Sequence, residues 1–121
     1  MRTLFNSVLF LLVTALTFAY ATTDVSGEWE VTIKTQEDEL VQSMRIEQDG
    51  ESLYVIMEEE MPGAEMEGEG TIKDNNIEWS VSRSTPQGQL IMSFSGKVEG
   101  DSMSGVVMIA EQGLRWTAVR K

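Results

Sequence analysis

Apolar and polar residues alternate along this chain from Trp29 to Lys121, in short runs separated by turn residues. Alternation with a period of two is typical of β-strands that bury one face and expose the other. Eight such runs can be read, at residues 27–35, 39–48, 51–60, 65–73, 76–84, 89–99, 102–110 and 113–120. The pattern therefore predicts an all-β chain of eight strands.

The connections between these runs keep the apolar residues on one side. Three dipeptides suit tight hairpin turns because Gly, Asn and Asp tolerate positive φ, namely Asp49-Gly50, Asp74-Asn75 and Gly100-Asp101. Across them we expect three facing pairs, which are Ile72 with Ile77, Val98 with Met103, and Ile46 with Leu53. Consecutive antiparallel strands of this kind favour an up-and-down meander that closes as a barrel, since closure removes the exposed edges.

The first 21 residues have the features of a secretory signal peptide. Arg2 supplies a positive charge, residues 8–18 are almost entirely apolar, and Ala19-Tyr20-Ala21 fits an A-x-A cleavage site. The apolar stretch is shorter than the ~20 residues that a membrane span needs. We therefore expect cleavage after Ala21, a secreted or periplasmic location, no membrane insertion of the remaining chain, and a single β-barrel domain at residues 22–121.

Charge and composition narrow the function classes. The chain has 20 acidic and 9 basic residues, which give a net charge of −11, and this argues against nucleic acids as partners. It has no cysteine and no histidine, so the usual zinc, haem and nucleophile–histidine sites are absent. We accordingly predict no metal and no cofactor, and a domain held together by its core without disulfides.

The first predicted strand opens with Gly27-Glu28-Trp29, which resembles the G-x-W motif of the calycin barrels, the group of lipocalins, fatty-acid-binding proteins and avidins. In that group a basic residue late in the last strand often packs over the Trp. The resemblance implies this part for Arg120, which shares the parity of Trp116. The C-terminal segment, from Gly96 onward, is also similar to small uncharacterised secreted bacterial domains.

Aromatic residues and glycines on the predicted inward face form a candidate ligand site. Pairing sets Trp79 opposite Phe94 and beside Gly70, while Phe94 faces Val107, which in turn faces Trp116. Small residues beside large rings would leave a pocket for a flat apolar ligand, lined by Trp29, Trp79, Phe94 and Trp116. The alternative is that the rings fill the space that the inward glycines 68, 70, 96 and 105 leave.

Three polar residues share the inward parity, namely Gln42, Glu59 and Arg83. Glu59 and Arg83 flank Met66 from neighbouring strands, near one end of the predicted barrel. An ion pair there would bind the polar group of a ligand or act as an acid–base pair. The alternative is a pair of side chains that merely plugs the end of the barrel.

Two outward-facing features are candidate partner surfaces. The hairpin at residues 58–69 is strongly acidic, and we expect Glu58 to oppose Glu67. A basic partner or Ca²⁺ would relieve the repulsion between these carboxylates. The alternative is that solvent and salt screen the repulsion. Ile91, Val106 and Met108 face outward although they are apolar, which suggests a weak homodimer or a protein partner on that wall.

These observations favour a non-enzymatic exported β-barrel that binds a small apolar or aromatic ligand. An interaction module acting through the outer face or the acidic hairpin is the first alternative. A barrel cyclase or isomerase that uses Glu59 and Arg83 is the second. A cavity that opens at the barrel mouth would favour ligand binding or catalysis, whereas a filled core would favour interaction.

Overall fold

The computed structural model describes residues 23–58 and 65–121, which form β-structure throughout. The strands are β1 (Gly27–Lys34), β2 (Glu39–Asp49), β3 (Ser52–Glu58), β4 (Met66–Lys73), β5 (Asn76–Thr85), β6 (Gly88–Glu99), β7 (Ser102–Ile109) and β8 (Gln112–Arg120). Each pairs antiparallel with the next, and β1 also pairs with β8, which closes the sheet. The predicted eight-stranded meander and its barrel closure are confirmed.

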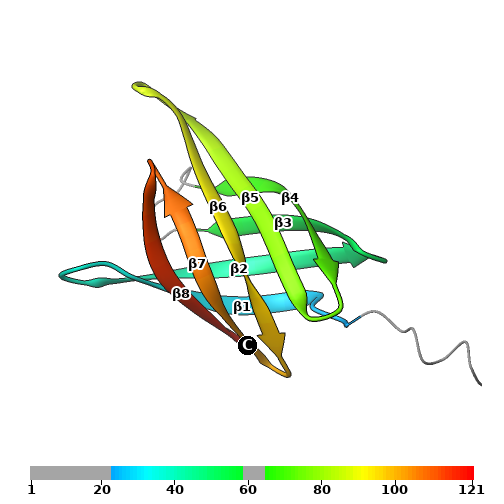
Figure 1. Ribbon diagram of the computed structural model, residues 1–121. Helices are drawn as coiled ribbons and strands as arrows, with labels where there is room; N and C mark the ends of the chain where they lie inside the picture. The colour runs from blue at the N-terminus through cyan, green and yellow to red at the C-terminus, as the bar shows by residue number, and fades with distance from the viewer. Residues whose placement is uncertain (1–22, 59–64) are drawn as a thin grey trace, which may run out of the picture.

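The strands on the two sides of the barrel cross each other. In Figure 1, β1, β2 and β3 run across the picture behind β5, β6 and β7, which run steeply from upper left to lower right. Such crossing follows from the twist of antiparallel strands, which accumulates around a closed sheet. The space between the two sides holds the core.

Every second side chain points into this core. In β1 and β3 the alternation is complete, because three alternating residues of each strand are buried and the residues between them are not. The buried apolar residues are Val25, Trp29, Val31, Ile33, Met44, Ile46, Leu53, Val55, Met57, Met66, Ile72, Ile77, Trp79, Val81, Met92, Phe94, Val98, Met103, Val107, Trp116 and Ala118. Their removal from water is the main stabilising contribution in a domain without disulfides.

The turn positions confirm part of the predicted register and correct part of it. Two predicted facing pairs are confirmed, namely Ile72 with Ile77 and Val98 with Met103. Ile46, however, faces Val55, and its predicted pairing with Leu53 is wrong. The reason is that Gly50, with φ of 63°, begins the β2–β3 turn, while Asp49 still belongs to β2. A shift of two residues leaves every side chain on its predicted face.

The β7–β8 hairpin shows the same kind of shift. Ala110 and Glu111 both have positive φ, at 50° and 66°, and they form its turn. Trp116 therefore faces Gly105, and its predicted pairing with Val107 is wrong. Positive φ is uncommon for residues other than glycine, so neither residue type marks this turn in the sequence.

Residues 23–26 cover the end of the barrel at which the β2–β3, β4–β5 and β6–β7 turns lie, here called the sealed end. Val25 is fully buried there, and its N–H donates to Gln48 Oε1 at 2.7 Å. The Gln48 amide donates to the Thr23 carbonyl at 2.8 Å, and Trp29 Nε1 donates to the Val25 carbonyl at 2.9 Å. These bonds hold the segment across the end of the core.

Arg120 fastens the same segment from β8. Its Nη1 donates to the Ser26 carbonyl at 2.7 Å and its Nη2 to the Asp24 carbonyl at 3.1 Å. Its Nε forms an ion pair with Asp101 at 3.1 Å. Its guanidinium carbon lies 4.5 Å from the centre of the Trp29 ring, which confirms the predicted contact between these two residues. Arg120 thus ties the last strand to the first strand and to the segment before it.

The opposite end carries the β1–β2, β3–β4, β5–β6 and β7–β8 connections and is here called the loop end. The β5–β6 hairpin projects beyond the β7–β8 turn (Figure 1), and Thr85 Oγ1 closes it by donating to the Gly88 carbonyl at 2.6 Å. Residues 59–64, which include Glu59, follow β3 in the chain and lie outside the described residues, as does the predicted signal peptide.

Candidate functional site

Three of the four predicted aromatic site residues form one cluster in the middle of the core. Trp79 and Phe94 are paired across β5 and β6, and their rings stack with 4.6 Å between centroids. Trp116 meets both rings edge-on, at 5.1 Å from Trp79 and 5.7 Å from Phe94. Distances in this range are those of packed aromatic pairs. The three rings therefore contact one another directly.

The inward glycines beside this cluster do not leave a void. A Cβ at Gly68 or Gly105 would lie 1.7 or 1.9 Å from a backbone oxygen of the neighbouring strand. At Gly70 and Gly96 the distances would be 2.2 and 2.1 Å, and Gly96 would also meet the Trp116 ring at 2.8 Å. The glycines allow strands and rings to approach closely, which fills the space that a ligand beside them would need.

Trp29 lies apart from the other three aromatic residues. It is fully buried at the sealed end, beneath Arg120, with its indole N–H bonded to the Val25 carbonyl. Both the ring and its polar group thus have partners within the protein. The structure separates Trp29 from the cluster with which the sequence analysis grouped it.

The loop end has a different character, because its inward-facing side chains are only partly buried. Leu90, Ile109 and Leu114 pack against the core from three successive strands without being fully covered. Leu40, at the start of β2, keeps 47% of its surface exposed. Together with Arg83, near the end of β5, they form an apolar rim with one positive charge, here called the loop-end rim.

Arg83 is the distinctive member of the loop-end rim. It pairs with Leu90 across β5 and β6. Its side chain is half-buried, and its Nε is fully covered yet has no hydrogen-bond partner among the described residues. A buried N–H group without an acceptor costs free energy, typically about 1–3 kcal/mol. Such a group is relieved by water or by a ligand that brings an acceptor.

The two other predicted polar residues are placed as follows. Gln42 is buried, with 7% of its surface exposed, and it follows Leu40 inward along β2. Glu59 lies outside the described residues, so its predicted pairing with Arg83 stays a prediction. Trp79 Nε1 is also buried, with no hydrogen-bond partner in the described part of the chain. Polar groups of the inward face are thus present both at the loop end and in the aromatic cluster.

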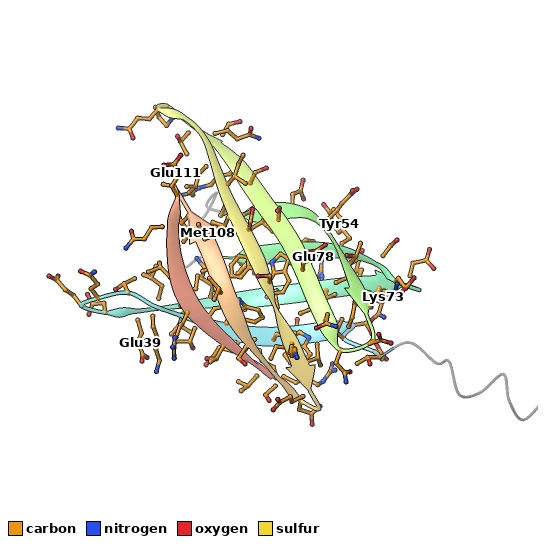
Figure 2. The ribbon with its side chains drawn as sticks, viewed as in Figure 1. Glu39, Tyr54, Lys73, Glu78, Met108 and Glu111 are labelled. Carbon is orange, nitrogen blue, oxygen red and sulfur yellow. The ribbon has the colours of Figure 1, made fainter. Side chains whose placement is uncertain are left out.

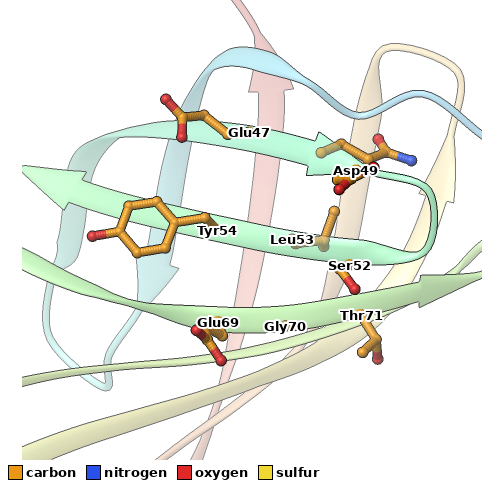
Figure 3. Close-up of a pocket in the computed structure, with 9 residues that line it drawn as sticks. Glu47, Asp49, Ser52, Leu53, Tyr54, Glu69, Gly70 and Thr71 are labelled. Carbon is orange, nitrogen blue, oxygen red and sulfur yellow. The ribbon is translucent and has the colours of Figure 1, made fainter.

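One surface depression lies outside the barrel, along β2, β3 and β4. It encloses about 660 Å³ and is open to solvent, with Tyr54 between Glu47 and Glu69 (Figure 3). The Tyr54 hydroxyl donates to Glu67 at 2.6 Å, and this bond raises the pKa of Tyr54 above its usual value. Tyr54 is not among the predicted site residues, although its outward position in an acidic strand pair was a usable signal in the sequence.

The register corrects the predicted arrangement of this acidic surface. Glu67 lies opposite Ile56, so the predicted opposition of Glu58 and Glu67 is wrong. An apolar neighbour and the Tyr54 hydroxyl take the place of a second carboxylate, which lowers the repulsion on the strand pair. In residues 23–58 and 65–121, no group of three potential ligand residues is arranged to hold a metal ion.

In comparisons with known proteins, no family model and no curated protein matched this chain. Residues 23–58 and 65–121 contain no helix that is long and apolar enough to span a membrane.

Proposed function

We propose that this protein is an exported, non-enzymatic binding protein of the calycin-like type. Its ligand is a small molecule with an apolar or aromatic body and one anionic or hydrogen-bond-accepting group, and it binds at the loop-end rim. The observation that carries this proposal is the buried Nε of Arg83, which lacks an acceptor among the described residues. An acceptor on the ligand would supply the missing bond and gain a charge-assisted interaction.

The apolar part of the ligand has a matching surface. Leu40, Leu90, Ile109 and Leu114 expose part of their side chains around the end of the barrel. Covering them would remove apolar area from water, which contributes about 25 cal/mol per Å². The packed aromatic cluster and the crowded inward glycines fill the middle of the core, an outcome that taken alone favours an interaction module. The proposed ligand therefore binds at the end of the core, on the loop-end rim, and not deep within it.

Two further observations support the calycin-like type. The chain forms an eight-stranded antiparallel barrel. The G-x-W tryptophan, Trp29, packs under Arg120 at the sealed end. Export is supported by the predicted signal peptide. A non-enzymatic role is supported by the inward face of the loop end, where Arg83 is the one charged side chain among the described residues.

Binding is tested with two environment-sensitive dyes, the anionic 8-anilinonaphthalene-1-sulfonate and the neutral Nile red. We expect saturable quenching of tryptophan fluorescence by the anionic dye at one-to-one stoichiometry. Arg83→Met should weaken binding of the anionic dye by at least about tenfold, the equivalent of one charge-assisted bond, and should affect the neutral dye less.

Arg45→Met is the matched control, since Arg45 is exposed on the outer face of β2. It removes the same charge from the protein but not from the loop end. Equal loss of anionic dye binding in both variants would show that only overall charge matters. Absence of binding to either dye would count against ligand binding and in favour of an interaction module.

A further inference from the structure

The outer surface of β5, β6, β7 and β8 differs from the rest of the barrel wall and is here called the neutral wall. Its outward residues lie in cross-strand rows given by the strand pairing. One row is Ser80, Ser93, Met108 and Gly113, the next is Glu78, Ser95, Val106 and Arg115, and a shorter one is Ser82 and Ile91. The first and third rows contain no charged side chain.

Exposed apolar side chains form a ridge on this wall. Val106 and Met108 are each 45% exposed on β7, and Ile91 is 51% exposed on the neighbouring strand β6. Met108 and Glu78 both lie on this side of the barrel (Figure 2). The predicted outward positions of Ile91, Val106 and Met108 agree with this burial pattern.

A depression lies beside the ridge. It has a volume of about 410 Å³ and is open to solvent over β4, β5 and β6. Its lining includes Ser80, Ser93, Ser95 and Met108, together with the carboxylates Glu69 and Glu78. Short serine side chains make the floor low, whereas Val106 and Met108 stand above it on the next strand. The wall therefore carries a ridge and a groove side by side, which is the arrangement that a self-complementary surface needs.

Electrostatic repulsion between two negatively charged copies favours contact through the wall that carries the fewest carboxylates. The chain has a net charge of −11, so two copies repel each other over most of their surface. The strands beside the neutral wall carry this charge most strongly, because Glu47, Asp49, Glu58, Glu67 and Glu69 are exposed on β2, β3 and β4. The neutral wall carries fewer carboxylates, with Glu78 within it and Glu69 at its edge, and it also exposes the apolar ridge.

We propose that two copies of this chain associate through the neutral wall, about a two-fold axis that runs along the strands between β6 and β7. This axis places β7 of one copy on β6 of the other, so that Val106 and Met108 enter the groove over Ser95 and Ser93. It also places β5 on β8. Glu78 and Arg115 are the two ends of one row, and the axis therefore sets Glu78 of each copy against Arg115 of the other.

Sedimentation equilibrium of the purified protein tests the association, with the wild type expected to dimerise reversibly. Met108→Glu should weaken the dimer by at least about tenfold, because two-fold symmetry places two carboxylates in the interface. Val41→Glu is the matched control, since Val41 is 53% exposed on β2, outside the neutral wall, and it should leave the dimer intact. A monomeric wild type at the highest soluble concentration, or equal loss in both variants, overturns the proposal.

Charge reversal tests the position of the axis. Glu78→Arg and Arg115→Glu should each weaken the dimer, because each sets two like charges against each other. The double variant restores opposite charges and should recover most of the wild-type association. Additive weakening in the double variant would overturn the proposed axis. Since all these residues face outward, thermal melts should show the variants folded as the wild type is.

Discussion

Arg120 and Arg83 both project from the inward face of a strand, but they lie at opposite ends of the barrel and their surroundings differ. At the sealed end, Arg120 donates to two carbonyl groups and to Asp101, and its guanidinium covers the Trp29 ring. At the loop end, Arg83 has a covered Nε without an acceptor among the described residues. The same residue type makes three hydrogen bonds and a cation–π contact at one end, whereas at the other its covered Nε has no partner among the described residues.

This difference indicates separate roles for the two ends. A guanidinium whose three nitrogens each donate to a fixed acceptor holds chain segments together, and at the sealed end it joins β8, β1 and the segment before β1. A guanidinium with a buried donor to spare lowers stability slightly in the free protein and favours any molecule that completes its bonds.

The largest effect is expected for the aromatic cluster that lies between the two ends. Trp79→Ala removes a ring that contacts both Phe94 and Trp116 and should lower the free energy of unfolding by about 3–5 kcal/mol. Denaturant unfolding followed by circular dichroism measures it. The control is Ser80→Ala, which alters the next, outward-facing residue and should change stability by less than about 0.5 kcal/mol. An unchanged midpoint for Trp79→Ala would contradict the packing described above.

The same substitution at the two arginines compares the ends directly. Arg120→Met should lower the free energy of unfolding by about 2 kcal/mol, since it leaves two carbonyl groups without a charged donor and removes the cation–π contact. Arg120→Lys should recover only part of this loss, because an ammonium group lacks the planar fork that reaches both carbonyls. Full recovery with lysine would show that charge alone seals this end.

Arg83→Met should have a much smaller effect on stability. Replacing a buried donor that has no acceptor by an apolar side chain removes an unfavourable burial. The free energy of unfolding should therefore stay within about 0.5 kcal/mol of the wild-type value or rise. The measurement is the same denaturant series. A loss as large as that of Arg120→Met would mean that Arg83 is a structural clamp, which would remove the main support for a ligand at the loop end.

The smallest effect concerns the titration of Asp24 at the sealed end. The Ser26 hydroxyl and backbone N–H donate to its carboxylate, and together they lower the pKa of Asp24 below its usual value of 3.8. A lowered pKa in the folded state means that this stabilisation is present above the unfolded pKa and is lost as the pH falls through the folded pKa. Ser26→Ala should move the pKa of Asp24 upward, as followed by NMR of the side-chain carboxyl. An unchanged value would show that the hydroxyl bond does not persist in solution.

The sequence predicted which residues of the candidate site face inward, but it did not predict which of them lie together. Parity alone placed Trp79, Phe94 and Arg83 on the inward face, and the pairing of Trp79 with Phe94 is confirmed. Parity could not separate Trp29 from the other rings, because residues of equal parity can lie at either end of a barrel. Nor could it show that Gly70 and Gly96 are crowded, since crowding depends on how closely the neighbouring strands approach.

The alternation of residues along the chain by itself determined the eight strands, their order and the face to which each side chain points. These features depend on neighbours in the sequence and on short turns, which residue types specify locally. The tertiary structure decided the register at the Gly50 and Ala110 turns and the level of each residue along the barrel. Across the sheet, Arg120 pairs with Trp29, Trp29 with Met44, Met44 with Met57, and Met57 with Met66. The residue after Met66, Glu67, pairs with Ser82, the residue before Arg83, so this row of pairs leads from Arg120 to the neighbourhood of Arg83. Because barrel strands are tilted, this row descends from the sealed end to the loop end, and only closure of the sheet gives the two arginines their different surroundings.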